Sequence, residues 1–167
     1  MFIFILRHGI ALDREQWNSN SDAGRPLTAE GERQLQTSAA AMKRMGLQFD
    51  VILSSPFERA KRTAQIVAQI LRLEKKLQLT RHLQSDGDPK KLVRQITRLK
   101  PSPRRLLLVG HEPYLSGLIS VLATGKKKMK TAFEKGGLCC LETGALEHDR
   151  CARWLWLLTP AQMAQMA

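Results

Sequence analysis

The chain has 167 residues, of which 43% are hydrophobic and 25% are charged. This composition argues against intrinsic disorder, and the length fits one domain over residues 1–167. The formal net charge of +12 favours anionic partners, although for charge alone a solvated basic surface is the simpler interpretation.

Apolar runs separated by helical patterns indicate an α/β fold. The runs that predict strands are Phe2–Leu6, Val51–Leu53, a weaker Leu77–Leu79, Leu106–Val109, Leu138–Leu141 and Trp154–Leu158. Four helices are predicted between them. The first begins after Thr28 and ends at Gly46, the second begins after Pro56, and the third carries Leu92, Ile96 and Leu99. The fourth follows Pro113, a residue that suits the first helical position. The alternation predicts a three-layer α/β/α arrangement with a mostly parallel central sheet. Its two longest loops cover about 7–26 and 124–137.

The cysteines and the chain ends point to a cytoplasmic protein. Cys139, Cys140 and Cys151 are odd in number and show no CxxC spacing, which favours reduced thiols over a disulfide framework. The apolar run before Arg7 is too short for a signal peptide, and the run near the C-terminus is too short to span a bilayer.

Three of the expected strands lead into residues that carry chemistry. The first strand runs directly into Arg7 and His8, the strand Leu106–Val109 runs into His111, and Arg59 lies in the first turn of the helix after the second strand. Because ligands of open α/β sheets bind outside the carboxyl ends of the strands, we expect these side chains at one edge. Taken alone, Arg59 would be interpreted as a surface arginine and His111 as a structural histidine.

Two histidines and two arginines share a use in phosphoryl transfer. Arginine binds phosphate with a planar fork of donors, and neutral histidine is a nucleophile. Because this reaction depends mainly on positioning and charge neutralisation, arginines can take the place of a metal, so we expect no metal and no cofactor. The sequence has no GxxxxGK[ST], no GxGxxG and no Cys-x5-Arg loop.

Five motifs lie along the chain in order: Leu6-Arg7-His8-Gly9, Arg25-Pro26-Leu27-Thr28-x-x-Gly31, Ser54-Ser55-Pro56-x-x-Arg59-Ala60-x-x-Thr63-Ala64, Val109-Gly110-His111-Glu112-Pro113 and Lys135-Gly136-Gly137. These five motifs resemble the histidine phosphatase superfamily, and within it the SixA-type phosphohistidine phosphatases. The resemblance extends from Phe2 to about Pro160 and implies a phosphoglycerate-mutase-like fold with no large cap domain.

The resemblance implies a role for each matching residue. His8 aligns with the nucleophile that becomes phosphorylated, and Arg7, Arg59 and His111 align with the rest of the phosphate pocket. We expect a backbone carbonyl to hold the other nitrogen of His8. Lys135 is a candidate substrate-binding residue.

The general acid is open between Glu112, Asp86, Asp88 and no acid at all. Glu112 follows His111 directly, as in the acid-phosphatase branch, but it can also be a carboxylate that stabilises a helix start. Asp88 can cap the helix after Pro89. Imidazole has a pKa near ~6.5 and is readily protonated as a leaving group, so a weak or absent acid favours a phosphohistidine substrate.

We therefore expect a phosphatase that removes phosphate from phosphohistidine in a histidine phosphotransfer domain or a carrier protein. The run Lys126–Lys130 can dock such a partner or can be a solvated loop. The alternatives are a small-molecule phosphomonoesterase and a basic phosphate- or nucleic-acid-binding protein without catalysis. An aromatic content of 5% and the lack of a binding motif argue against nucleic acid, and we expect a monomer without a membrane partner.

Overall fold

The computed structural model describes residues 1–18, 21–129 and 131–167, and the strands in them form a single mixed sheet. Six strands lie in the order β3-β2-β4-β1-β5-β6 in this described part of the chain. The first four are parallel, whereas β5 is antiparallel to both of its neighbours. Every predicted strand is confirmed, the weak one included: β1 (Phe2–Arg7), β2 (Val51–Ser54), β3 (Leu77–Leu79), β4 (Arg105–Gly110), β5 (Leu138–Thr143) and β6 (Ala152–Leu158).

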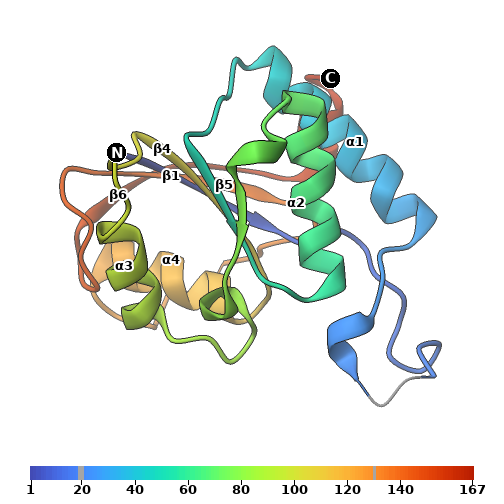
Figure 1. Cartoon of the computed structure of the whole chain (residues 1–167), viewed down its shortest axis with the longest axis horizontal. Helices are drawn as coiled ribbons and strands as arrows, with labels where there is room; N and C mark the ends of the chain where they lie inside the picture. The colour runs from blue at the N-terminus through green and yellow to red at the C-terminus, as the bar shows by residue number, and fades with distance from the viewer. Residues whose placement is uncertain (19–20, 130) are drawn as a thin grey trace.

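Helices cover both faces of this sheet, which confirms the layered α/β arrangement (Figure 1). One face packs against α1 and α2 and the other against α3 and α4, while α5 lies against α1. The helices are α1 (Ala29–Arg44), α2 (Glu58–Leu71), α3 (Pro89–Thr97), α4 (Tyr114–Thr124) and α5 (Pro160–Ala164), and the short 3-10 turns are η1 (Asp22–Gly24), η2 (Glu74–Lys76) and η3 (Arg81–Leu83).

The central strands are buried on both faces, as their uninterrupted apolar sequences predict. In β1, Ile3 and Ile5 join the core beneath α3 and α4, while Phe4 and Leu6 join the core beneath α1 and α2. Successive side chains of a strand point to opposite faces, so a strand between two helical layers needs apolar residues at every position. The carboxyl ends of β1, β2 and β4 are thereby held side by side at one edge.

The start of α1 is tied to the segment that follows β1. The Thr28 hydroxyl accepts a hydrogen bond from the Gly31 N–H at 3.0 Å, which confirms the predicted cap. A Cβ added at Gly31 would lie 2.2 Å from the carbonyl oxygen of Ile10, so only glycine permits this close approach.

The structure corrects three details of the predicted helices. Leu99 lies beyond the end of α3, which stops at Thr97. Pro113 is the residue before α4 and not its first helical residue. The short α5, which sequence periodicity did not indicate, begins with a capping box formed by Thr159 and Gln162.

The cysteines are free thiols, with Cys139 and Cys140 buried in β5 and Cys151 partly exposed. In the residues that the structure describes, no helix combines the length and the apolar character needed to cross a bilayer.

Candidate active site

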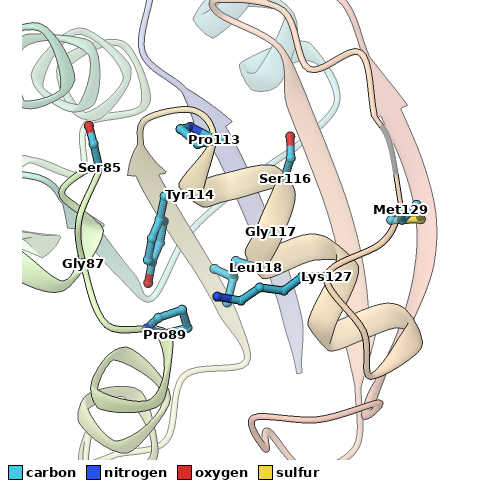
Figure 2. Close-up of a pocket in the computed structure, with 10 residues that line it drawn as sticks. All are labelled: Ser85, Gly87, Pro89, Pro113, Tyr114, Ser116, Gly117, Leu118, Lys127 and Met129. Carbon is cyan, nitrogen blue, oxygen red and sulfur yellow. The ribbon is translucent and has the colours of Figure 1, made fainter.

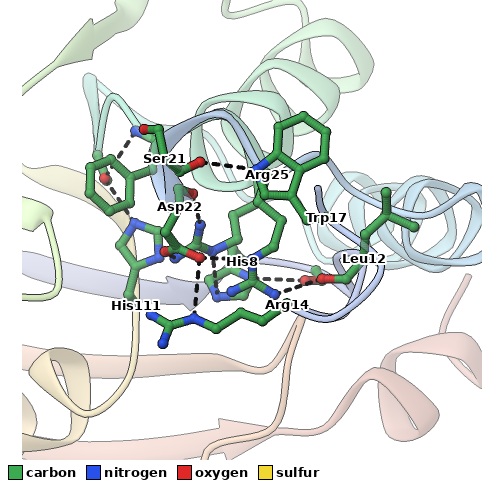
Figure 3. A network of polar contacts seen from close by, with 12 residues as sticks. His8, Leu12, Arg14, Trp17, Ser21, Asp22, Arg25 and His111 are labelled. Atoms are coloured by element: carbon green, nitrogen blue, oxygen red, sulfur yellow. Dashed lines mark hydrogen bonds and ion pairs between the residues drawn. The ribbon is translucent and has the colours of Figure 1, made fainter. Parts of the chain in front are cut away.

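The structure brings His8 and His111 together at the carboxyl ends of β1 and β4 (Figure 3), and Arg59 reaches His8 from the first turn of α2. The ring centres of His8 and His111 are 5.0 Å apart, and the Arg59 Nε–H donates to His8 Nε2 at 3.4 Å. Arg7 is close enough for its charge to lower the pKa of both histidines. These residues are far apart in sequence, and the parallel pairing of β1 with β4 explains their meeting.

His8 is held as a neutral ring whose Nε2 faces Arg59. Its Nδ1 lies 2.8 Å from the carbonyl oxygen of Gly9, an acceptor, so Nδ1 carries the proton and Nε2 keeps its lone pair. Burial lowers the pKa of His8 to about 3, with the nearby charges of His111, Arg59 and Arg7 acting in the same direction. The ring therefore has a lone pair available for nucleophilic attack at neutral pH.

His111 is oriented by Ser55, a residue to which the sequence motif assigned no role. The Ser55 hydroxyl accepts from the Phe57 N–H at 3.3 Å and lies 2.8 Å from His111 Nε2. If the Ser55 proton is donated to Nε2, the His111 proton is on Nδ1. In the described part of the chain, His111 Nδ1 and Arg7 Nε are buried without a hydrogen-bond partner. With that tautomer, two buried donors without a partner among the described residues lie near His8.

The buried histidines make a testable prediction about acid stability. Burial lowers the pKa of His8 and of His111 from 6.5 to about 3. Between pH 6.5 and about 3, each histidine therefore binds a proton in the unfolded chain but not in the folded chain. The free energy of unfolding should therefore fall as pH drops below about 6.5, by up to about 1.4 kcal/mol per pH unit for each histidine. Urea unfolding at pH 7, 6 and 5 measures this loss. His8→Ala should reduce the slope, and an unchanged slope would contradict the assignment of His8 as neutral.

Arg59 is buried, so its interpretation as a surface arginine is wrong. Its side chain packs 5.4 Å from the ring centre of Phe57, and the residue is 3% exposed. The Arg59 Nη1–H donates to the backbone carbonyl of Asp22 at 2.9 Å, and Nη2–H donates to the Asp22 carboxylate at 2.8 Å. Its Nε–H points towards Nε2 of His8.

Asp22 is the site residue that sequence reasoning missed. Its carboxylate also accepts from Arg25 Nε at 2.9 Å and lies 3.6 Å from Arg14 Nε, so it is surrounded by arginines (Figure 3). Burial raises the pKa of Asp22, but Arg59 and Arg25 outweigh burial and keep the pKa below its usual value. The only sequence signal was its place in a long loop just before Arg25-Pro26, and that loop contains two other acidic residues, Asp13 and Glu15.

Backbone contacts fix the strand end that carries Arg7 and His8. The Gly9 N–H donates to the Thr63 hydroxyl at 3.1 Å, and this hydroxyl donates to the carbonyl of Arg59 at 2.7 Å. The Gly136 N–H donates to the carbonyls of Arg7 and His8 at 3.1 and 3.0 Å, from a backbone with φ of 79° that favours glycine. Lys135 is thereby placed next to the site, but its side chain forms no hydrogen bond or ion pair with any residue that the structure describes.

Two of the acidic candidates accept hydrogen bonds at the starts of helices, and the third is exposed. The Glu112 carboxylate accepts from the Ser116 N–H at 2.9 Å and from the Ser116 hydroxyl, in the first turn of α4. Its charge raises the pKa of Arg7 against the lowering effect of burial. Asp88 caps α3 by accepting from the N–H groups of Lys90 and Lys91 at 2.9 and 3.3 Å, and Asp86 is exposed. In the residues described, no three His, Cys, Asp or Glu side chains group so as to hold a metal ion.

Comparison with known proteins points to one family. The model of branch 1 of the histidine phosphatase superfamily matches residues 3–84. The chain is 30% identical to the phosphohistidine phosphatase SixA of Escherichia coli over 128 residues, which cover 75% of this chain and 76% of that protein. It is 34% identical over 146 residues to an uncharacterized protein of Picosynechococcus sp., covering 87% of each. A structure of the protein histidine phosphatase SixA with tungstate matches 96% of this chain and 98% of that one, with a TM-score of 0.82 and 24% identity.

Proposed function

This chain belongs to the histidine phosphatase superfamily as a SixA-like hydrolase, and we propose that it removes phosphate from phosphohistidine in a signalling or carrier protein. The observation that carries the proposal is that Nε2 of neutral His8 lies among buried hydrogen-bond donors. His8 Nε2 faces the Nε–H of Arg59, and the buried Arg7 Nε and His111 Nδ1 have no partner among the described residues. A phosphoryl group at Nε2 would supply the missing acceptors.

The first step transfers the phosphoryl group to the enzyme. The lone pair of His8 Nε2 attacks phosphorus, a new N–P bond forms, and the N–P bond to the substrate imidazole breaks. The substrate ring, protonated on its other nitrogen, takes the electrons of the broken bond and leaves as neutral imidazole. His8 keeps its proton on Nδ1, where the Gly9 carbonyl accepts it and stabilises the positive ring.

The second step regenerates the enzyme with water. A water molecule attacks phosphorus, its proton passes to solvent, and the His8 N–P bond breaks to release inorganic phosphate and neutral His8. In both steps Arg7 and Arg59 neutralise charge on the phosphoryl oxygens, and neutral His111 donates a hydrogen bond. The burial of Arg59 and His111 strengthens their interactions because water does not screen them.

Glu112 is not needed as an acid in this scheme, and its contacts with Ser116 support a capping role. We expect Glu112→Gln, which keeps one acceptor for the helix, to change kcat on a phosphohistidine substrate by less than about threefold. A residue that acts as general acid contributes about 10²–10⁴-fold. Stopped assays of phosphate release measure the difference, and a hundredfold loss would make Glu112 the acid.

The experiment that tests the proposal compares substrates for the wild-type protein. Phosphate release is measured from a histidine-phosphorylated carrier protein, from free phosphohistidine and from a panel of phosphomonoesters. Rapid release from the carrier with slow release from esters supports the proposal. Release from esters alone would move the substrate to small metabolites while keeping the chemistry of His8.

A further inference from the structure

A groove lies beside the candidate site, between the segment 85–89 and the start of α4 (Figure 2). Its volume is about 440 Å³. We call it the α4 groove and define it by lining residues from three segments: Ser85, Pro89, Tyr114, Gly117, Lys127 and Met129.

The α4 groove adjoins the phosphate site through Glu112. Pro113 and Ser116 line the groove, and Ser116 binds the Glu112 carboxylate with its N–H and its hydroxyl. Glu112 in turn follows His111 and acts electrostatically on Arg7. The groove therefore begins at Pro113, two residues after His111, on the other side of Glu112 from the candidate phosphate site.

The floor of the groove has unfilled space and an unpaired polar group. A Cβ added at Gly117 would meet no atom within 4 Å, so this turn of α4 leaves room for another molecule. Tyr114 is 8% exposed, and its hydroxyl has no hydrogen-bond partner in the described part of the chain. Figure 2 shows the Tyr114 ring between segment 85–89 and α4, with the hydroxyl near Pro89. Buried polar groups normally have partners, so this one points to an absent ligand.

The rim of the groove carries the positive charge of Lys127, an exposed side chain on a backbone segment held against α4. The hydroxyl of buried Ser120 donates to the carbonyl of Lys126 and accepts from the Met129 N–H at 3.0 Å. The Thr124 hydroxyl donates to the Ser120 carbonyl at 2.8 Å and accepts from the Lys126 N–H at 3.2 Å. These bonds hold the backbone on both sides of Lys127 against α4. Of the predicted run Lys126–Lys130, Lys130 lies outside the described residues.

We propose that the α4 groove binds the segment of the phosphorylated protein that adjoins its phosphohistidine, with an acidic side chain on Lys127 and apolar atoms over Gly117. This inference rests on the proposed function. Charge complementarity selects the occupant, because the net charge of +12 and the Lys127 side chain at the rim favour an acidic partner surface. A small phosphate ester has no neighbouring chain segment to occupy the groove, so the groove would distinguish protein substrates from small ones.

The first test fills the groove without touching the phosphate site. Gly117→Leu should lower kcat/KM on a histidine-phosphorylated carrier protein at least about tenfold and leave hydrolysis of free phosphohistidine within about twofold. The matched control is Gly144→Leu, because Gly144 also has no atom within 4 Å of an added Cβ and lies outside the groove. It should change neither rate.

The second test reverses the charge at the rim. Lys127→Glu should lower kcat/KM on the carrier and weaken its salt dependence, whereas Lys75→Glu, an equal charge change on η2, should have less effect. Two outcomes would overturn the inference while the proposed function stands. Either both groove variants hydrolyse the carrier at the wild-type rate, or they lose as much activity on free phosphohistidine as on the carrier. If the wild-type protein hydrolyses neither substrate, the proposed function fails and the inference fails with it.

Discussion

Replacing His8 by alanine is expected to lower phosphate release by about 10³-fold or more, because the variant has no atom that can form the N–P bond. The fold should persist, since the ring of His8 contributes one local hydrogen bond to the neighbouring Gly9 carbonyl. Release from a histidine-phosphorylated carrier protein is measured by single-turnover quench for the variant and the wild type. A variant that retains normal turnover would rule out His8 as the nucleophile.

The same experiment can detect the intermediate directly. Wild-type protein quenched in alkali should gain the mass of one phosphoryl group on the peptide that contains His8, and the alanine variant should not. His148→Ala is a suitable control because His148 lies in the loop between β5 and β6, away from the carboxyl ends of β1 and β4. Label on the wild-type protein at another histidine would contradict the assignment.

Replacing Arg59 by alanine is expected to lower kcat by about 10²–10³-fold, the usual effect of removing one donor to a developing anion. Arg59→Lys should recover little of this loss. A lysine keeps the charge, but it cannot donate to the backbone carbonyl and the carboxylate of Asp22 while also pointing a donor at His8. Steady-state kinetics on free phosphohistidine measure both variants, and near wild-type activity of Arg59→Lys would show that only the charge of Arg59 matters.

Asp22→Ala tests how much the orientation of Arg59 contributes to activity, because Arg59 itself is kept. The substitution removes one charge-assisted hydrogen bond to Arg59 but leaves the bond to the backbone carbonyl, so we expect a smaller loss of kcat, about tenfold. Circular dichroism and thermal unfolding serve as the control for folding. An increase in activity would mean instead that the Asp22 carboxylate competes with phosphate for Arg59.

The contribution of tertiary contacts is clearest at Asp22, Ser55 and the groove. Asp22 binds a residue 37 positions away, and Ser55 binds one 56 positions away. Arg7 is anchored by the carbonyl of Phe133, 126 positions away, through its Nη1–H at 2.6 Å. No local pattern distinguishes Asp22 from Asp13 or Glu15 in the same loop, so only the folded arrangement identifies it.

The sequence by itself determined the strands, most of the helices and the four residues that meet at the sheet edge. Those features depend on short-range patterns: apolar runs, a capping threonine, and motifs placed where a strand gives way to a helix. The strand order, the burial of Arg59 and the α4 groove were decided by tertiary structure alone. These three features depend on which distant elements pack together. The packing must bury both faces of the sheet at the same time, and the sequence of a single segment does not specify its distant partners.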